Sequence, residues 1–284
     1  MSILTDYHTH PKRTPDDLPA ERHREHFLES MRSYAKRAAD LGIDELGFTE
    51  HIYRLSIAPG AVPWKAEGGV RGEVGGYVAA AVEVREICAG LREQKQVAPV
   101  IRVGMEVDIV PSTVSILQAA LPLFPFDYIL GSVHRVPDLA ESATPEEAYR
   151  GYYDTVRWAS ASGLFHSIAH PDRVHRKAAS VSTSFLEEEM TETVSTLAKH
   201  GVSVEVSSSG LRGGFSGIDP HATFLELCFR HGVTITLGSD AHKLEAIGDG
   251  IPQVRDIAWQ TGYREVATYE RGRKVMRPLR QPGD

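Results

Sequence analysis

Short apolar runs alternate with longer helix-like segments along most of this chain. The runs that have the length and composition of buried strands are residues 3–7, 45–49, 97–103, 128–132, 166–169, 202–206 and 234–237, with an eighth candidate at 265–269. Helical periodicity covers residues 22–41, 78–92, 145–162, 184–200, 221–231 and 244–261. Strands that alternate with helices of this length predict parallel β/α units. Seven or eight such units predict an α/β barrel, and an open doubly wound sheet is the alternative.

One domain is expected, spanning residues 1–284. That length suits a single β/α barrel, and neither an internal repeat nor a low-complexity linker divides the chain. A segment rich in glycine and proline, residues 58–76, interrupts the alternation. We expect a loop at 53–76, which is either a lid over an active site or a surface insertion.

Composition and charge favour a soluble cytoplasmic protein that does not bind nucleic acid or membranes. The net charge is −7, which attracts polyanions poorly. The two cysteines, Cys88 and Cys228, lie in apolar helical contexts and are predicted to be buried free thiols. The start of the chain has no signal-peptide pattern, and no apolar window is long enough to span a membrane. A basic run at 271–280 is interpreted as a solvated strand and tail.

Residues of the kind that bind metals stand at the same end of six predicted strands. They are His8, His10, Glu50, His51, Glu106, His134, His170, Asp240 and His242. The carboxyl ends of parallel strands converge on the functional face of a barrel. Residues at i and i+2 of a strand share one side, so both residues of each i, i+2 pair can face the mouth.

Imidazoles combined with carboxylates suit zinc, manganese or iron. A single His-x-His motif is more often a pair of core histidines than a ligand pair, but agreement at six strand ends is improbable by chance. The number of ligands predicts two or three divalent ions, with Glu106 able to bridge them.

The remaining histidines are assigned other roles. His166 begins a strand and is expected to pack at the far end of the barrel, whereas His175 stays ambiguous because it follows the His170 strand end by a few residues. The histidines predicted to lie on the surface or at helix ends are His23, His26, His200, His221 and His231.

The order of these motifs resembles the polymerase-and-histidinol-phosphatase (PHP) superfamily, and within it the monofunctional histidinol-phosphatases. The matching elements are His8-x-His10, Asp16, Thr49-Glu50-His51, Gly104-Met105-Glu106-Val107-Asp108, Gly131-Ser132-Val133-His134, His170-Pro171-Asp172, Ser209-Gly210-Leu211-Arg212 and Leu237-Gly238-Ser239-Asp240-Ala241-His242. The resemblance implies a distorted (β/α)7 barrel of PHP type, with a three-metal site at the carboxyl ends of the strands.

The resemblance also implies roles for individual residues. The implied metal ligands are His8, His10, Asp16, His51, Glu106, His134, His170, Asp240 and His242, with Asp17 as a substitute for Asp16. Asp240, His242 and Arg212 are the implied catalytic residues. Arg212 and a second basic residue would bind the substrate phosphate, and Arg176 is preferred for the second role over Arg173 or Lys177.

The implied reaction is hydrolysis of a phosphomonoester, specifically L-histidinol phosphate in histidine biosynthesis, by a hydroxide that bridges two metals. The general acid for the leaving alcohol stays open between metal-bound water, Asp240 and a histidine of the site. Ser207-Ser208-Ser209 replaces the Asn-Thr that family members often carry there, and residues 135–138 lack the usual aromatic and glycine residues. The alternatives are therefore another small phosphomonoester or a nucleotide as substrate, a nuclease, and a non-catalytic metal-binding protein.

Overall fold

The computed structural model describes residues 2–11, 22–57, 73–136, 139–140, 142–176, 181–212 and 217–283. Asp16 and its substitute Asp17 lie outside these residues, and so does most of the predicted loop at 53–76. At the described edges of that loop, Ser56 forms a bridge with Glu73, and the next helix begins at Val74.

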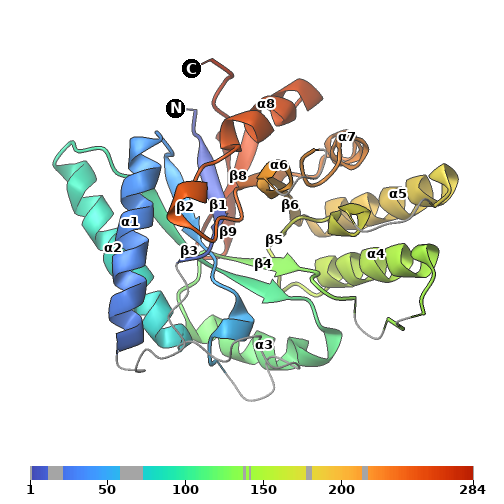
Figure 1. Cartoon of the computed structure of the whole chain (residues 1–284), viewed down its shortest axis with the longest axis horizontal. Coiled ribbons are helices and arrows are strands. Elements are labelled where there is room, and N and C mark those ends of the chain that lie inside the picture. The colour runs from blue at the N-terminus through green and yellow to red at the C-terminus, as the bar shows by residue number, and fades with distance from the viewer. Residues whose placement is uncertain are drawn as a thin grey trace.

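Seven parallel strands form the centre of the molecule (Figure 1), in the spatial order of the chain. They are β1 (Thr5–Thr9), β2 (Glu45–Phe48), β3 (Val100–Asp108), β4 (Tyr128–Ser132), β5 (Ser167–Ile168), β6 (Ser203–Ser207) and β7 (Ile235–Gly238). The ends of the sheet meet, because the His10 amide donates to the Ala241 carbonyl at 2.8 Å and Thr9 forms a bridge with Ala241. The fold is a nearly closed (β/α)7 barrel, which confirms the predicted class and excludes the open sheet.

Helices surround the strands, with α1 and α2 on one side and α4 and α5 on the other (Figure 1). The helices are α1 (His23–Asp40), α2 (Val74–Glu93), α3 (Val114–Ala120), α4 (Pro145–Ala161), α5 (Thr183–His200), α6 (Ser209–Arg212), α7 (Ala222–Arg230) and α8 (Ile251–Thr261). The short 3-10 turns are η2 (Ile52–Arg54), η3 (Pro111–Thr113), η4 (Leu121–Leu123), η5 (Arg173–Arg176) and η6 (Leu244–Ala246).

Local chemistry explains several helix ends. Thr144 and Glu147 form a reciprocal capping box at the start of α4, and Gly201 ends α5 with φ of 64°. The predicted helix at 244–261 is wrong as one element, because left-handed glycines at 248 and 250 separate η6 from α8. The short helix α3 was not predicted.

The eighth strand candidate is a strand, but it lies outside the barrel. β8 (Glu265–Glu270) pairs antiparallel with β9 (Arg273–Pro278), and this hairpin packs on the amino ends of the barrel strands. Its Tyr269 packs in a buried cluster with Tyr7 and Tyr128 and makes an edge contact with His166, which confirms the far-end position of His166. The two ends of the chain lie side by side, since the Ile3 amide donates to the Pro278 carbonyl at 2.9 Å.

The basic run at 271–280 is less solvated than its composition indicates. Lys274 is partly buried, and its Nζ donates to the Gly201 carbonyl at 2.6 Å and to Thr234 Oγ1 at 2.9 Å. Cys88 and Cys228 are buried free thiols, as predicted. Among the described residues, none of the helices combines the length and the apolar character that crossing a membrane requires.

Candidate metal centre

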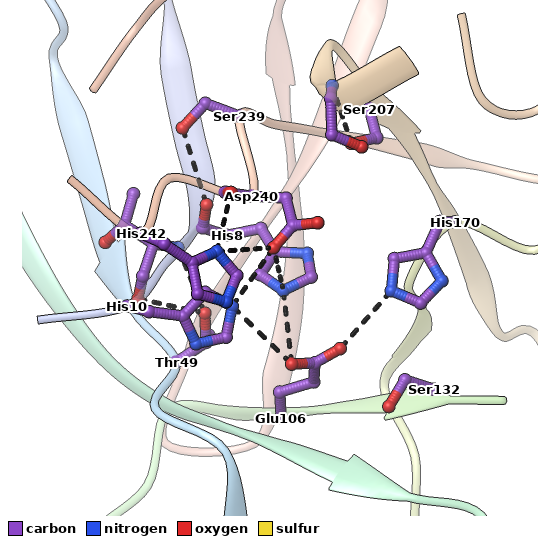
Figure 2. Close-up of polar contacts among 12 residues, drawn as sticks. His8, His10, Thr49, Glu106, Ser132, His170, Ser207, Ser239, Asp240 and His242 are labelled. Carbon is purple, nitrogen blue, oxygen red and sulfur yellow. Dashed lines mark hydrogen bonds and ion pairs between the residues drawn. The ribbon is translucent and has the colours of Figure 1, made fainter. Parts of the chain in front are cut away.

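The barrel gathers the predicted ligands at the carboxyl ends of its strands (Figure 2). The described residues that meet there are His8 in β1, His10 after β1, His51 after β2, Glu106 in β3, His134 after β4, His170 after β5, and Asp240 with His242 after β7. They span more than two hundred positions of the chain, so only closure of the barrel brings them together. Glu50, beside His51, pairs with Arg54 at 3.0 Å, and its Oε1 lies 3.9 Å from His10 Nδ1.

Glu106 lies at the middle of this group, and its side chain is 1% exposed. A buried carboxylate among imidazoles offers two oxygens to two sides of the site. Oε2 lies 2.5 Å from His51 Nδ1, 3.5 Å from His8 Nε2 and 3.5 Å from His10 Nε2, and Oε1 lies 3.3 Å from His170 Nε2 and 3.6 Å from His134 Nε2.

Asp240 and His242 complete the group from the loop after β7. Asp240 Oδ1 lies 3.2 Å from His10 Nε2 and 3.4 Å from His242 Nδ1. His242 Nε2 lies 3.2 Å from His51 Nε2. Asp240 and His170 adopt positive φ angles of 51° and 33°, a conformation that is uncommon for residues other than glycine and tends to occur at functional sites.

The donor set fits divalent cations. His8 Nε2, both ring nitrogens of His10, His51 Nδ1 and both oxygens of Glu106 are buried and have no hydrogen-bond partner among the described residues. An unsatisfied buried polar atom costs about 1–3 kcal/mol. A bound ligand would explain why so many such atoms lie together here. Three overlapping triads have ligand atoms within 4.8 Å of one another: His10, His51 and His242; His8, His10 and Glu106; and His51, Glu106 and His134. The three triads share His10, His51 and Glu106, each of which belongs to two of them.

Two carboxylates that were not among the predicted ligands orient these histidines. Glu205 in β6 lies with Oε1 2.8 Å from His8 Nδ1, and its Oε2 accepts the His170 amide at 2.8 Å. Asp108 Oδ1 lies 2.7 Å from His134 Nδ1. A carboxylate on one ring nitrogen fixes the ring and leaves the other nitrogen free for a metal. Asp108 belongs to a motif already noted, but Glu205 looks like any acidic residue in a strand.

Asp6 holds the loop that carries Asp240 and His242. Its carboxylate accepts hydrogen bonds from the Ser239 amide at 2.8 Å, Ser239 Oγ at 2.6 Å and the Gly248 amide at 3.0 Å. Burial raises the pKa of Asp6, and these three donors oppose that rise. The signal in the sequence is its position two residues before His8, on the same side of β1.

The surroundings of His8 and His10 shift the pKa values of these two histidines in opposite directions. Burial alone would lower the pKa of His8, but the carboxylates of Glu205, Glu106 and Asp240 raise it well above its usual value. Burial, together with the nearby His51 and His242, lowers the pKa of His10 well below its usual value.

The two carboxylates of the cluster are ionised. Burial would raise the pKa of both Glu106 and Asp240, but the surrounding histidines lower each well below its usual value. A cation that binds His8 must displace its proton, so binding here releases protons to solvent.

The structure places two of the arginines, Arg212 and Arg173, beside the cluster. The Arg212 guanidinium donates to the carbonyls of Asp249 at 3.1 Å and Asp240 at 3.4 Å, and also contacts the Ser239 carbonyl. Arg173, ranked behind Arg176 from sequence, places Nη1 3.2 Å from His170 Nε2. The Arg176 side chain lies outside the described part of the structure.

A nearly closed α/β barrel whose mouth gathers buried imidazoles and carboxylates defines a metal-dependent hydrolase. The PHP domain family matches residues 24–209, which is more than half of the chain. The protein therefore belongs to the PHP family.

Two relatives agree with this family, and a solved structure shares the fold. A curated protein of Deinococcus radiodurans named "Probable histidinol-phosphatase" is 26% identical over 261 residues, which covers 83% of this chain and 90% of that protein. One of Thermotoga maritima with the same name is 30% identical over 135 residues, covering 45% of this chain and 54% of that protein. The crystal structure of histidinol phosphate phosphatase from Lactococcus lactis, complexed with zinc, L-histidinol and phosphate, superposes with a TM-score of 0.72 at 22% identity. The superposition covers 97% of this chain and 100% of the Lactococcus lactis chain.

Proposed function

We propose that this protein is a metal-dependent phosphoric monoester hydrolase whose substrate is L-histidinol phosphate. The observation that carries the proposal is the buried cluster around Glu106, in which the ring nitrogens of His10 and the carboxylate oxygens of Glu106 have no described hydrogen-bond partner, with the Arg173 guanidinium beside it. The residues assigned to metal binding are His8, His10, His51, Glu106, His134, His170, Asp240 and His242, with Asp16 as a further ligand.

In this proposal each group has a chemical task. Divalent cations in such a site polarise phosphoryl oxygens and make water a nucleophile near neutral pH. Arg173 neutralises the phosphoryl oxygens where charge must be held in the transition state. Arg212 would join it by exchanging a backbone carbonyl for a phosphate oxygen, and Arg176 is the other candidate.

Hydrolysis forms a bond from a water oxygen to phosphorus, breaks the ester P–O bond, and delivers a proton to the leaving alcohol. We assign that transfer to Asp240 and His242: the ionised Asp240 carboxylate takes a proton from the attacking water, and it or His242 passes that proton to the leaving alkoxide. Their side chains are 12% and 37% exposed, whereas those of His8, His10 and Glu106 are at most 1% exposed, so Asp240 and His242 are more open to a leaving group than these three residues.

The names of the curated relatives support histidinol phosphate as the substrate, and the zinc in the Lactococcus lactis structure supports zinc over manganese or iron. A place in histidine biosynthesis in the cytoplasm belongs to the same proposal, and the two free thiols are consistent with a reducing compartment. Ser207-Ser208-Ser209 departs from the family's pattern beside the site, which favours another small phosphomonoester as the second candidate.

The test compares catalytic efficiency across a panel of phosphate esters, with the metal content of the purified protein measured by elemental mass spectrometry. Histidinol phosphate should have the highest kcat/KM, and a poor rank for it would contradict the substrate assignment. Arg173→Ala and Arg212→Ala should each lower turnover about a hundredfold with normal metal content. The exposed Arg230→Ala serves as a control.

A further inference from the structure

A second group of ligand-type residues lies outside the Glu106 cluster. Asp172, His175 and His221 each contribute one nitrogen or oxygen that lies within 4.8 Å of the other two. Asp172 and His175 follow β5, and His221 directly precedes α7, so the group occupies the rim of the barrel between neighbouring loops. It shares no residue with the three triads of the main cluster.

Asp172 fixes the position of His221. The carboxylate is 2% exposed, its Oδ1 accepts the Tyr153 hydroxyl at 2.6 Å, and its Oδ2 contacts His221 Nδ1. The His221 amide also points at Oδ2, at 3.4 Å. With Nδ1 held by a carboxylate, the ring presents Nε2 outward, which is the arrangement that orients metal-binding histidines.

His175 stacks on this oriented ring. The two imidazole centroids lie 4.3 Å apart with an angle of 5° between the planes. His175 Nδ1 lies 3.2 Å from the Tyr149 hydroxyl. No described residue forms a hydrogen bond with Nε2 of either ring, so two adjacent imidazoles each leave one nitrogen available.

A purely structural network explains only part of this group. It accounts for Asp172, which orders the start of α7 through the His221 amide. It does not account for His175, an exposed residue whose ring is nevertheless aligned on His221 and held through Nδ1. Two imidazoles and a carboxylate are a typical donor set for zinc and similar transition metals. Because an imidazole nitrogen donates in the plane of its ring, a shared ion would bind when the His175 ring turns out of the parallel stack.

We propose that His175 and His221 bind a further Zn²⁺-type cation at the rim, with Asp172 orienting His221 or supplying a third ligand. This site is separate from the Glu106 cluster. Because Asp172 follows His170 by two residues, an ion at the rim would also restrain the segment that carries His170. The proposal does not depend on which phosphate ester the enzyme hydrolyses.

The experiment uses the full chain dialysed against zinc and measures bound zinc by elemental mass spectrometry. The wild type should hold one zinc equivalent more than His175→Ala and His221→Ala. The exposed histidines at helix ends, in His200→Ala and His231→Ala, are matched controls that should keep the wild-type value. Equal zinc content in the wild type and His175→Ala would overturn the proposal, and since His175 is exposed, that variant should fold even if His221→Ala does not.

A second variant separates the rim from the main cluster. In Glu106→Gln, the equivalent that depends on His175 should remain, so the double variant Glu106→Gln/His175→Ala should hold one zinc fewer than Glu106→Gln alone. If Glu106→Gln already removes that equivalent, the ion belongs to the Glu106 cluster and the rim site does not exist. Isothermal titration with Zn²⁺ should show affinity for the additional ion at least about tenfold weaker in His175→Ala.

Discussion

The two ends of this barrel bury polar groups in opposite ways. At the hairpin end, the Tyr7 hydroxyl donates to Glu45 at 2.7 Å, the Tyr128 hydroxyl donates to the Tyr7 carbonyl at 2.6 Å, and the Tyr269 hydroxyl donates to the His166 carbonyl at 2.8 Å. At the mouth, the nitrogens of His10 and the oxygens of Glu106 are equally buried and have no described hydrogen-bond partner.

The difference separates a structural polar core from a binding site. Hydrogen bonds made within the protein stabilise the hairpin end without any ligand. At the mouth, the unpartnered nitrogens and oxygens are available to a cation. We therefore expect changes at the mouth to affect metal content and catalysis, and changes at the hairpin end to affect the free energy of unfolding.

The largest effect is expected from Glu106→Gln. Losing the carboxylate that faces five imidazoles should remove at least one metal equivalent and raise the activation barrier by about 5 kcal/mol, more than a thousandfold in kcat/KM. Elemental analysis and steady-state kinetics measure the two quantities. Glu45→Gln is the matched control, because Glu45 is also a buried strand carboxylate but bonds Tyr7 and Arg102. Normal metal content in Glu106→Gln would contradict the central role of Glu106.

A change at the hairpin end should lower stability and leave the metal content unaltered. Tyr269→Ala removes a ring that is 1% exposed and is expected to lower the free energy of unfolding by about 4 kcal/mol, as measured in urea. Metal content and kcat/KM of the folded protein should stay near wild type. Tyr269→Phe, which removes only the hydroxyl, should show a smaller loss. If Tyr269→Ala kept the wild-type free energy of unfolding but lost metal, the contrast between the hairpin end and the mouth would be wrong.

Glu205 tests whether the orientation of a ligand matters apart from its identity. Glu205→Gln should weaken metal affinity by about ten- to a hundredfold, because His8 loses the charged partner that fixes its ring. Competition with a chelator measures this affinity. Glu189→Gln alters another buried glutamate, paired with Arg157 on the outer helices, and should leave the affinity unchanged. Equal metal affinities in Glu205→Gln and Glu189→Gln would show that Glu205 does not support metal binding.

The smallest effect concerns pH at the hairpin end. Burial lowers the pKa of Lys274 from 10.5 to about 8. Below pH 8 the folded protein bears the unfavourable burial of this charge. Between pH 8 and 10.5 the unfolded chain binds more protons there, so this group makes stability rise with pH, by about 1 kcal/mol after allowance for solvent screening.

Urea unfolding of the wild type and Lys274→Met at pH 7.5 and pH 10 measures this difference. The wild type should gain stability relative to Lys274→Met as the pH rises. Arg277→Met on the same strand is exposed and should show no such change. A difference that shrinks with rising pH would refute the expected direction.

Much of this molecule follows from local pattern. The alternation of strands and helices predicted the barrel, and the position of His10, Glu106 and Asp240 after or within strands predicted that they would meet. Parallel strands in a barrel leave few other places for residues at their carboxyl ends. The prediction was weaker where the outcome depended on pairing, as with residues 265–269, whose composition specifies a strand but not the sheet that it joins.

The sequence alone determined which elements form and which chemistry is available, because hydrophobic period and residue type act over a few neighbouring positions. Only the tertiary structure decided that Glu205 orients His8 across 197 positions, that Asp6 holds the loop of Asp240, and that Arg173 reaches His170. These choices depend on distances between separate strands, which closure of the barrel sets and which no local pattern encodes. For the same reason, His175 and His221 became neighbours only in the folded chain.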